Sequence, residues 1–325
     1  MELLNGNSEG IAKDRKYDQG EASPLISVIV FVLNAAQTID RALRSVTADD
    51  QPQIELLVMD GGSTDGTLEV IRKYQSKLAY WRSRRDGSAA IAINEGVERA
   101  TGRVICLLPA DDWIEAGALH FVAKAFRADA ELQVLSCGTR VARVDKDGSI
   151  FSEVNFTDMR VLDFRMSNIV RCPLTTGRFI TRRLYKELGG YNPVYRISND
   201  LDFLIRVLMR RPKSQVQEHL VYTYRRHPGS RTLGGDPMII MEMMREFVRV
   251  AEHHLDASPL DAAERTALLG LHGRACARLG WMTAVRGEVV NGARVILKAI
   301  RRNRAFPFMV FVWIAQKLLR RGNPF

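Results

Sequence analysis

Short apolar runs alternate with segments of helical periodicity through the first 130 residues of the chain. The first run, residues 25–33, is rich in β-branched side chains and almost entirely apolar, which is typical of a strand covered on both faces. Strands that alternate with helices at this spacing form βαβ units around a parallel sheet. We therefore predict an α/β fold with strands at 25–33, 54–59, 78–81 and 104–108 and helices at 35–46, 67–74, 89–99 and 116–127.

The alternation ends after residue 131. Residues 132–144 and 149–154 are both extended in pattern, and the Asp147-Gly148 pair between them is typical of a hairpin turn. A polar stretch at 227–237 indicates a boundary loop, beyond which the pattern is helical only, with one helix expected over 281–300. The predicted organisation is a disordered lead at 1–23, a main domain at 24–236 with halves at 24–130 and 131–236, and a basic helical C-terminal extension at 237–325.

Composition excludes several classes of protein. Of the 325 residues, 46% are hydrophobic and 26% charged, so the chain forms an ordinary core and is neither a disordered chain nor a disulfide scaffold. Four cysteines stand without CxxC spacing, which predicts reduced thiols packed in the core and a cytoplasmic location. The net charge is +10, and the last 55 residues hold eleven basic residues against one acidic residue, Glu288, so they account for the whole excess.

The basic C-terminal segment also carries an apolar stretch. Residues 305–316 are uncharged and mostly apolar, and they are too few for the roughly 20 residues of a spanning helix. With cations on both sides, they predict an interfacial helix on an anionic membrane, within 281–321. The alternative is a helix folded back on the main domain. No nucleic-acid-binding motif accompanies the charge, and residues 1–23 show neither a secretory signal nor a membrane anchor.

Polar residues follow each of the first four predicted strands. The carboxyl ends of parallel strands lie at one edge of the sheet, where ligands of such folds bind. Carboxylates gathered there repel one another unless a cation or a ligand donor joins them. The residues predicted to meet at this edge are Asn34, Asp60, Asp86, Asp111 and Asp112.

The familiar main-chain phosphate loops are missing from the sequence. The first strand–helix turn reads Asn-Ala-Ala-Gln-Thr at 34–38, without the glycines of a dinucleotide-binding loop, and no GxxxxGK[ST] motif occurs. A nucleotide diphosphate would then need a divalent cation. Asp111 and Asp112 offer the hard oxygen ligands that such a cation prefers.

In these and neighbouring motifs, the chain resembles the inverting family 2 glycosyltransferases of the GT-A fold. The likeness rests on residues 27–34, on Val-Met-Asp-Gly-Gly-Ser-Thr-Asp-Gly-Thr at 58–67, on 86–102 and on Leu-Leu-Pro-Ala-Asp-Asp-Trp at 107–113. A fifth stretch at 188–206, with Ser-Asn-Asp-Leu-Asp at 198–202, is similar to the family's acceptor-side segment. The resemblance implies a nucleotide-diphospho-sugar transferase fold, a Rossmann-like mixed sheet flanked by helices.

The resemblance also assigns roles to individual residues. Asp60 matches the family's nucleoside-contacting Asp, and Asp86 lies on the same nucleotide side, where Asn34 and Asp112 are further expected donor contacts. Asp111 matches the metal-binding Asp, for Mg²⁺ or Mn²⁺, and His227 stands where some members place a metal-proximal His.

Asp200 matches the family's catalytic base, which would take the proton of the acceptor hydroxyl. The pattern departs from the family at Pro109, which leaves fewer metal-binding oxygens, and at Asn199, where Glu is common. Leu33 and Ile91 replace polar or aromatic residues and are expected to border the nucleotide pocket.

The leading hypothesis is therefore an enzyme that moves a sugar from a nucleotide-diphosphate donor to an acceptor hydroxyl with inversion. Its acceptor would be a carbohydrate or lipid-linked, in bacterial cell-surface polysaccharide or glycolipid assembly at the inner face of the cytoplasmic membrane. Two alternatives remain open: a nucleotidyltransferase of the same fold, and a binding protein that kept the fold without the activity.

Overall fold

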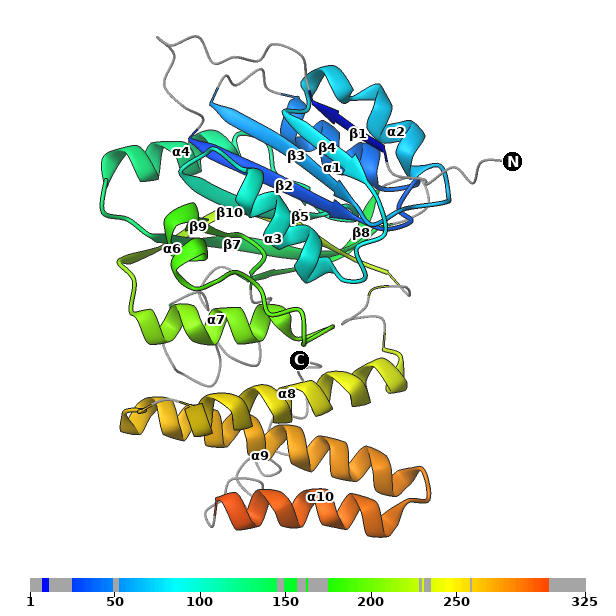
Figure 1. Cartoon of the computed structure of the whole chain (residues 1–325), viewed down its shortest axis with the longest axis vertical. Coiled ribbons are helices and arrows are strands. Elements are labelled where there is room, and N and C mark those ends of the chain that lie inside the picture. The colour runs from blue at the N-terminus through cyan, green and yellow to red at the C-terminus, as the bar shows by residue number, and fades with distance from the viewer. Residues whose placement is uncertain are drawn as a thin grey trace. The chain divides into compact units, whose positions relative to one another are not determined.

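The computed structural model describes residues 8–11, 25–48, 53–144, 149–156, 162, 175–227, 230, 235–257 and 259–303 (Figure 1). The chain divides into two compact units, Met1–Leu162 with Cys172–Ser230, and Asp163–Arg171 with Arg231–Phe325.

A ten-stranded mixed sheet forms the centre of the first unit. Strands β2 (Ile26–Val32), β3 (Ile54–Asp60), β4 (Tyr80–Ser83) and β5 (Val104–Pro109) pair in parallel in the order β4-β3-β2-β5. The four strands predicted from the apolar runs and their parallel pairing are confirmed.

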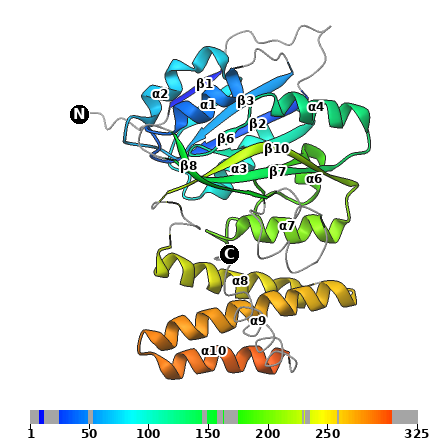
Figure 2. The same ribbon diagram turned by 180° about the vertical axis from the view of Figure 1, so that it is seen from behind.

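Two hydrophobic clusters lie on the two faces of this sheet, which Figures 1 and 2 show from opposite sides. Val28 and Val30 of β2 point into one cluster and Ile29 into the other, because side chains alternate along a strand. The first cluster takes in residues of α1 and α4, and the second takes in residues of α3 and α7. The predicted helices are confirmed as α1 (Ile39–Thr47), α2 (Thr67–Lys73), α3 (Ala89–Arg99) and α4 (Ala118–Ala128), with a 3₁₀ turn η1 at Gln75–Lys77.

The second half of the first unit completes the mixed sheet. β7 (Val134–Val144) and β8 (Ile150–Phe156) are antiparallel, which confirms the predicted pairing, although the turn at 145–148 lies outside the described residues. β10 (Ser214–Arg226) runs parallel to β7 and antiparallel to the short β6 (Trp113–Ile114). The remaining elements are β9 (Arg178–Thr181), α6 (Arg182–Glu187) and α7 (Asn199–Arg210).

The prediction of a disordered lead is wrong for Ser8–Ile11. These residues form the edge strand β1, antiparallel to β4. Strand addition of this kind uses backbone hydrogen bonds, so it needs no apolar run that a sequence pattern would reveal. Residues 1–7 and 12–23 lie outside the described residues.

Three helices make up the described part of the second unit: α8 (Pro237–Ala257), α9 (Ala262–Val285) and α10 (Val289–Arg302). The single helix predicted over 281–300 is wrong, because a turn at residues 286–288 interrupts it, with Gly287 at a positive φ of 93°. A Cβ added to Gly292 would lie 2.5 Å from the carbonyl oxygen of Gly280, so these glycines let α9 and α10 cross closely. Among the described residues, no helix is long and apolar enough to cross a bilayer.

Candidate active site

The loops that follow the four parallel strands meet at one edge of the first unit's sheet. In the strand register, Asp60 lies opposite Val32 on one side and opposite Ser83 on the other, while Pro109 lies opposite Phe31. The loops beginning at residues 33, 61, 84 and 110 therefore start side by side. This edge carries most of the predicted site residues.

Asn34 joins the first of these loops to the second. Its backbone has a positive φ of 52°, a conformation that Asn tolerates better than most residues. The backbone N–H of Asn34 donates to Ser63 Oγ at 2.7 Å, and the side-chain oxygen of Asn34 accepts from the backbone N–H of Thr64 at 2.9 Å. The structure thus places Asn34 in a link between the two loops.

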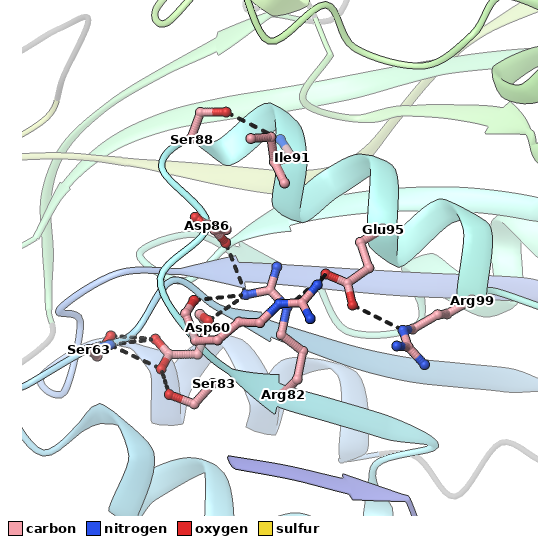
Figure 3. A network of polar contacts seen from close by, with 10 residues as sticks. Asp60, Ser63, Arg82, Ser83, Asp86, Ser88, Ile91, Glu95 and Arg99 are labelled. Carbon is pink, nitrogen blue, oxygen red and sulfur yellow. Dashed lines mark hydrogen bonds and ion pairs between the residues drawn. The ribbon is translucent and has the colours of Figure 1, made fainter. Parts of the chain in front are cut away.

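Asp60 is completely buried at the end of β3. One carboxylate oxygen accepts from the hydroxyl of Ser83 at 2.5 Å, and the backbone N–H of Ser63 lies 3.1 Å from the same oxygen (Figure 3). The other oxygen accepts from the hydroxyl of Ser63 at 2.5 Å. Since each oxygen already has protein donors, the Asp60 carboxylate holds the loop after β3 in place.

A buried arginine, Arg82 of β4, links Asp60 to Asp86. One terminal nitrogen donates to the backbone carbonyl of Asp60 at 2.6 Å and to Oδ2 of Asp86 at 3.0 Å (Figure 3). Its Nε donates to Oε2 of Glu95 at 3.1 Å, and the Arg82 side chain is only 2% exposed. The guanidinium is therefore the counter-ion of this part of the site.

Glu95 of α3 gathers further cations around the same cluster. Arg84 and Arg99 also form ion pairs with it, at 2.8 and 3.1 Å. Burial raises the pKa of Glu95, but the charges of Arg82, Arg99 and Arg84 outweigh burial, so the pKa is lowered overall. Glu95 thus stays ionised and neutralises part of the positive charge near Asp86.

Leu33 and Ile91 lie near this cluster as exposed apolar side chains. Leu33 is 62% exposed and Ile91, in the first turn of α3, is 42% exposed. A Cβ added to Gly61 would touch both Asp86 and Leu33, so these two side chains flank Gly61. The structure brings Leu33 to the edge where the sequence predicts a nucleotide pocket.

The two adjacent aspartates after β5 face different surroundings. Asp112 is buried, and its two oxygens accept from the hydroxyl of Tyr222 at 2.6 Å and from the N–H of Arg225 at 2.8 Å, both on β10. Burial, and then the charge of Asp111, raise the pKa of the Asp112 carboxyl well above its ordinary value. Asp112 therefore anchors the motif to β10.

Asp111 is the open member of the pair. Its side chain is 34% exposed, and Oδ2 lies 3.1 Å from Nε2 of His227, which is 29% exposed. The predicted metal residues Asp111 and His227 come together from positions 116 residues apart in the chain. Their meeting depends on β10, which pairs with β6 just after Asp111 and ends directly before His227.

The pair at Asp111 fits a divalent cation in its donor chemistry. A carboxylate oxygen and an imidazole nitrogen are both ligands of Mn²⁺ and related ions, and Asp111 and His227 already face each other. Within the part of the chain that the structure describes, no group of three or more His, Cys, Asp or Glu side chains forms a metal site. A cation held here would take its other ligands from a bound diphosphate or from water.

Asp200 lies in the first turn of α7, in the first unit. Burial, and then the charge of Asp200, raise the pKa of Tyr191, so the carboxylate and this phenol are electrostatic neighbours. Asp202, two residues on, is buried and forms an ion pair with Arg206 at 2.7 Å. Asp202 thus stabilises the helix, while Asp200 stands one position inside its N-terminus.

A clasp, made by Asn94, Gly190, Tyr191 and Arg206, fixes the segment before α7 to α3. The Asn94 side-chain amide accepts from the N–H of Tyr191 and donates to its carbonyl, both at 2.7 Å. Arg206 donates to the carbonyls of Leu188 and Gly190 at 2.5 and 2.8 Å. A Cβ added to Gly190, whose φ is +71°, would lie 2.5 Å from the Asn94 oxygen, so this close approach requires glycine. The clasp therefore fixes the segment that leads into α7 relative to α3.

Sequence reasoning missed Arg82, Glu95 and Asn94. The predicted strand at 78–81 ends one residue before Arg82, whereas β4 extends to Ser83 and so places Arg82 inside the sheet. No comparable pattern distinguished Asn94, because its partners lie 97 residues away.

Comparison with known proteins agrees with this geometry. The profile of glycosyl transferase family 2 matches residues 27–189. A PGL/p-HBAD biosynthesis glycosyltransferase of Mycobacterium bovis is 32% identical over 189 residues, which are 57% of this chain and 70% of that protein. A chondroitin synthase of Pasteurella multocida is 28% identical over 192 residues, 57% of this chain but only 19% of the synthase.

Solved structures show the same architecture. The mannosyltransferase PcManGT from Pyrobaculum calidifontis, in complex with GDP-Man and Mn²⁺, gives a TM-score of 0.58 at 18% identity over 93% of this chain and 82% of that one. S. aureus TarS, in complex with UDP-GlcNAc, gives 0.54 at 17% identity over 86% and 92%. At these identities the likeness establishes the fold, which is the GT-A-type fold with C-terminal helices.

The family match decides between the classes left open by the sequence. A match over half of the chain, and relatives named as glycosyltransferases, favour a glycosyltransferase over a nucleotidyltransferase or a binding protein without activity. Together with the ordered strand-end motifs, it shows that this chain belongs to glycosyl transferase family 2.

Proposed function

We propose that the enzyme transfers a sugar from a nucleotide-diphosphate donor to an acceptor hydroxyl with inversion at the anomeric carbon. The observation that carries this proposal is the half-open pair of Asp111 and His227, beside a sheet edge whose other carboxylates are already bonded to the protein. The relatives' names, which include glycolipid and polysaccharide enzymes, support an acceptor in cell-surface glycolipid or polysaccharide assembly.

The nucleotide side of the donor is assigned to the loops after β2, β3 and β4. Asn34 and Asp60 hold the backbone of these loops, and Asp86, fixed by Arg82, presents a carboxylate at their edge. We assign Asp112 to positioning rather than to donor contact, because both of its oxygens accept from β10.

Asp111 and His227 would hold Mg²⁺ or Mn²⁺, which supplies positive charge to the diphosphate as it leaves. The Mn²⁺ bound in the similar PcManGT structure supports this assignment. Several carboxylates can then lie at one sheet edge without strong repulsion. Arg82 neutralises the charge of Asp86, and the charge of Asp111 is left for the bound cation.

Asp200 is the proposed base. An acceptor hydroxyl has a pKa far above neutrality, so a carboxylate must take its proton as the oxygen attacks the anomeric carbon. Attack from the face opposite the diphosphate inverts that carbon. The clasp between Asn94 and Tyr191 supports this role, because it fixes the start of α7 relative to α3.

The Asp200→Asn variant tests the mechanism. Sugar transfer should fall by about 10²-fold or more, the usual contribution of a general base, while titration with the nucleotide sugar should show unchanged binding. Asp40→Asn is a matched control, because Asp40 is likewise the second residue of a helix, α1. Undiminished transfer by Asp200→Asn would remove Asp200 from the mechanism.

We place the enzyme at the inner face of the cytoplasmic membrane, acting on a lipid-linked acceptor. The support is the basic C-terminal extension together with the glycolipid relative. The expected interfacial segment at 305–316 lies outside the described residues, so the proposal depends on the part of the extension before residue 304.

A further inference from the structure

An exposed apolar and cationic surface surrounds the α9–α10 turn in the second unit. The described part of the chain has ten exposed large hydrophobic side chains, and five of them lie within 281–297. Their exposure ranges from 51% to 69%. They are Trp281, Val285, Val289, Val290 and Leu297, which together with the arginines beside them we call the hairpin face.

Helical spacing arranges the hairpin face in two stripes. On α9, Arg278, Trp281 and Val285 follow at intervals of three and four residues, so they share one side of the helix. The buried residues Leu279, Gly280 and Thr283 occupy the other side. The exposed side chains of α9 are therefore not part of the packing against α10.

The second stripe is on α10. Val290, Arg294, Leu297 and Arg301 recur at the same intervals, and all four are exposed. Gly292 and Ala299 are the buried residues of this helix, and Gly292 lies against Gly280. Gly280 and Gly292 thus allow the two helices to approach closely, and Ile296 packs beside them, whereas the side chains of the two stripes stay outside this contact.

The cations of the hairpin face are not committed to acids of the protein. In the described residues Arg278, Arg286 and Arg301 form no ion pair, whereas Arg302, on the same helix, pairs with Asp256 and Lys298 pairs with Glu252. Glu288 is the single acidic residue after position 270. Free guanidinium groups beside exposed Trp, Val and Leu match the interfacial region of an anionic bilayer, where arginines meet lipid phosphates and apolar side chains meet acyl chains.

We propose that the hairpin face binds the surface of an anionic membrane. A second copy of the chain is a poorer occupant, because joining two such faces would bring arginines against arginines. The chain's own residues 304–325 are poorer for the same reason, since they contain Arg304, Lys317, Arg320 and Arg321 and no acid. This surface deepens the proposed membrane location and rests on it, but it does not depend on the chemistry at Asp111 or Asp200.

Vesicle binding by the full chain tests the proposal. The protein should sediment with vesicles of phosphatidylcholine plus phosphatidylglycerol and much less with phosphatidylcholine alone. Trp281→Ser combined with Val290→Ser should weaken binding about tenfold or more, since both the inserted ring and the apolar stripe are lost. Arg286→Gln should weaken binding to the anionic vesicles by a smaller factor.

Two variants serve as matched controls. Phe151→Ser removes a comparably exposed apolar side chain (58%) from β8 of the first unit, and Arg265→Gln removes an exposed arginine from the opposite end of α9. Both should bind vesicles as the wild type does. Turnover of nucleotide sugar with a soluble acceptor should be unchanged in all four variants, which separates failure of the surface from failure of the proposed enzyme.

Quenching of tryptophan fluorescence by brominated lipid identifies the residue in contact. Trp81 and Trp113 are buried, so Trp281 and Trp313 are the two reporters. In a Trp313→Phe protein, anionic vesicles should still quench the fluorescence, and adding Trp281→Phe should abolish the quenching. Quenching that depends on Trp313 alone, equal binding to neutral vesicles, or a dimer that the Trp281 and Val290 changes dissolve would each overturn the proposal.

Discussion

The two ends of the acidic sheet edge contain the same residue type in opposite environments. At one end, Asp60 is buried with donors on both oxygens, and Asp86 is paired with the buried Arg82. At the other end, Asp111 is one-third exposed and meets His227. The protein supplies its own cation, Arg82, at the first end, whereas we propose that an external cation binds at the second.

This difference separates holding a loop from holding a ligand. A buried carboxylate with satisfied oxygens gives rigidity, because removing one partner leaves another polar group unpaired. Keeping a partly exposed carboxylate ionised costs little free energy, and its oxygens remain available to a ligand. We therefore expect changes at the Arg82 end to affect stability and changes at the Asp111 end to affect catalysis.

The largest expected effect is on catalysis, at Asp111. Asp111→Asn should lower sugar transfer by about 10²- to 10³-fold, the usual cost of losing one electrostatic contact to a leaving group, with little change in the melting temperature. Transfer rates over a Mn²⁺ titration measure this, and the variant should need more metal for its residual activity.

Asp112→Asn is the matched control for Asp111→Asn. Burial and the charge of Asp111 raise the pKa of Asp112 and so disfavour its ionised form, and an amide oxygen can accept from the Arg225 N–H while the amide nitrogen donates to the Tyr222 hydroxyl, so we expect little loss of stability or activity. If Asp112→Asn lost as much activity as Asp111→Asn, the division of roles between the two residues would be wrong.

The second effect is on stability, at Arg82. Arg82→Met should destabilise the fold by about 3 kcal/mol, because Asp86 and Glu95 would lose their shared buried cation. Denaturant unfolding measures it. Arg84→Met is the control: Arg84 pairs with the same Glu95 but is 46% exposed, so its loss should cost about 1 kcal/mol or less. Equal costs for the two variants would show that Arg82 is not the counter-ion of this cluster.

The sequence predicted those features that depend on local pattern. The apolar runs of β2 to β5 and the period of α1 to α4 follow from burial on two sheet faces, and the strand ends placed Asp60, Asp86 and Asp111 at one edge. The hairpin of β7 and β8 followed from a turn pair between two extended runs.

Features that depend on distant partners were not predictable. Asp111 and Asp112 are neighbours in sequence, and only the position of β10 decides which of them is buried by Tyr222. Arg82 finds its partners on three other segments, and β1 joins the sheet through backbone pairing alone. The break between α9 and α10 falls at one glycine inside a continuous helical pattern.

The smallest expected effect is a pH dependence from the Arg82 end. The pKa of Glu95 is lowered in the folded protein, since its three arginines outweigh burial, so the folded state binds fewer protons than the unfolded chain. The stabilisation is fully present above the unfolded pKa of about 4.3 and is lost as the pH falls through the lower folded value. Melting temperatures of wild type and Glu95→Gln should therefore differ at neutral pH and converge on acidification.

Glu98→Gln, which removes a 66% exposed partner of Lys186, should follow the wild type at every pH. A gap between wild type and Glu95→Gln that stayed constant down to pH values well below about 4 would mean that Glu95 contributes packing rather than charge, and that the protein's own cations do not neutralise this end of the sheet edge.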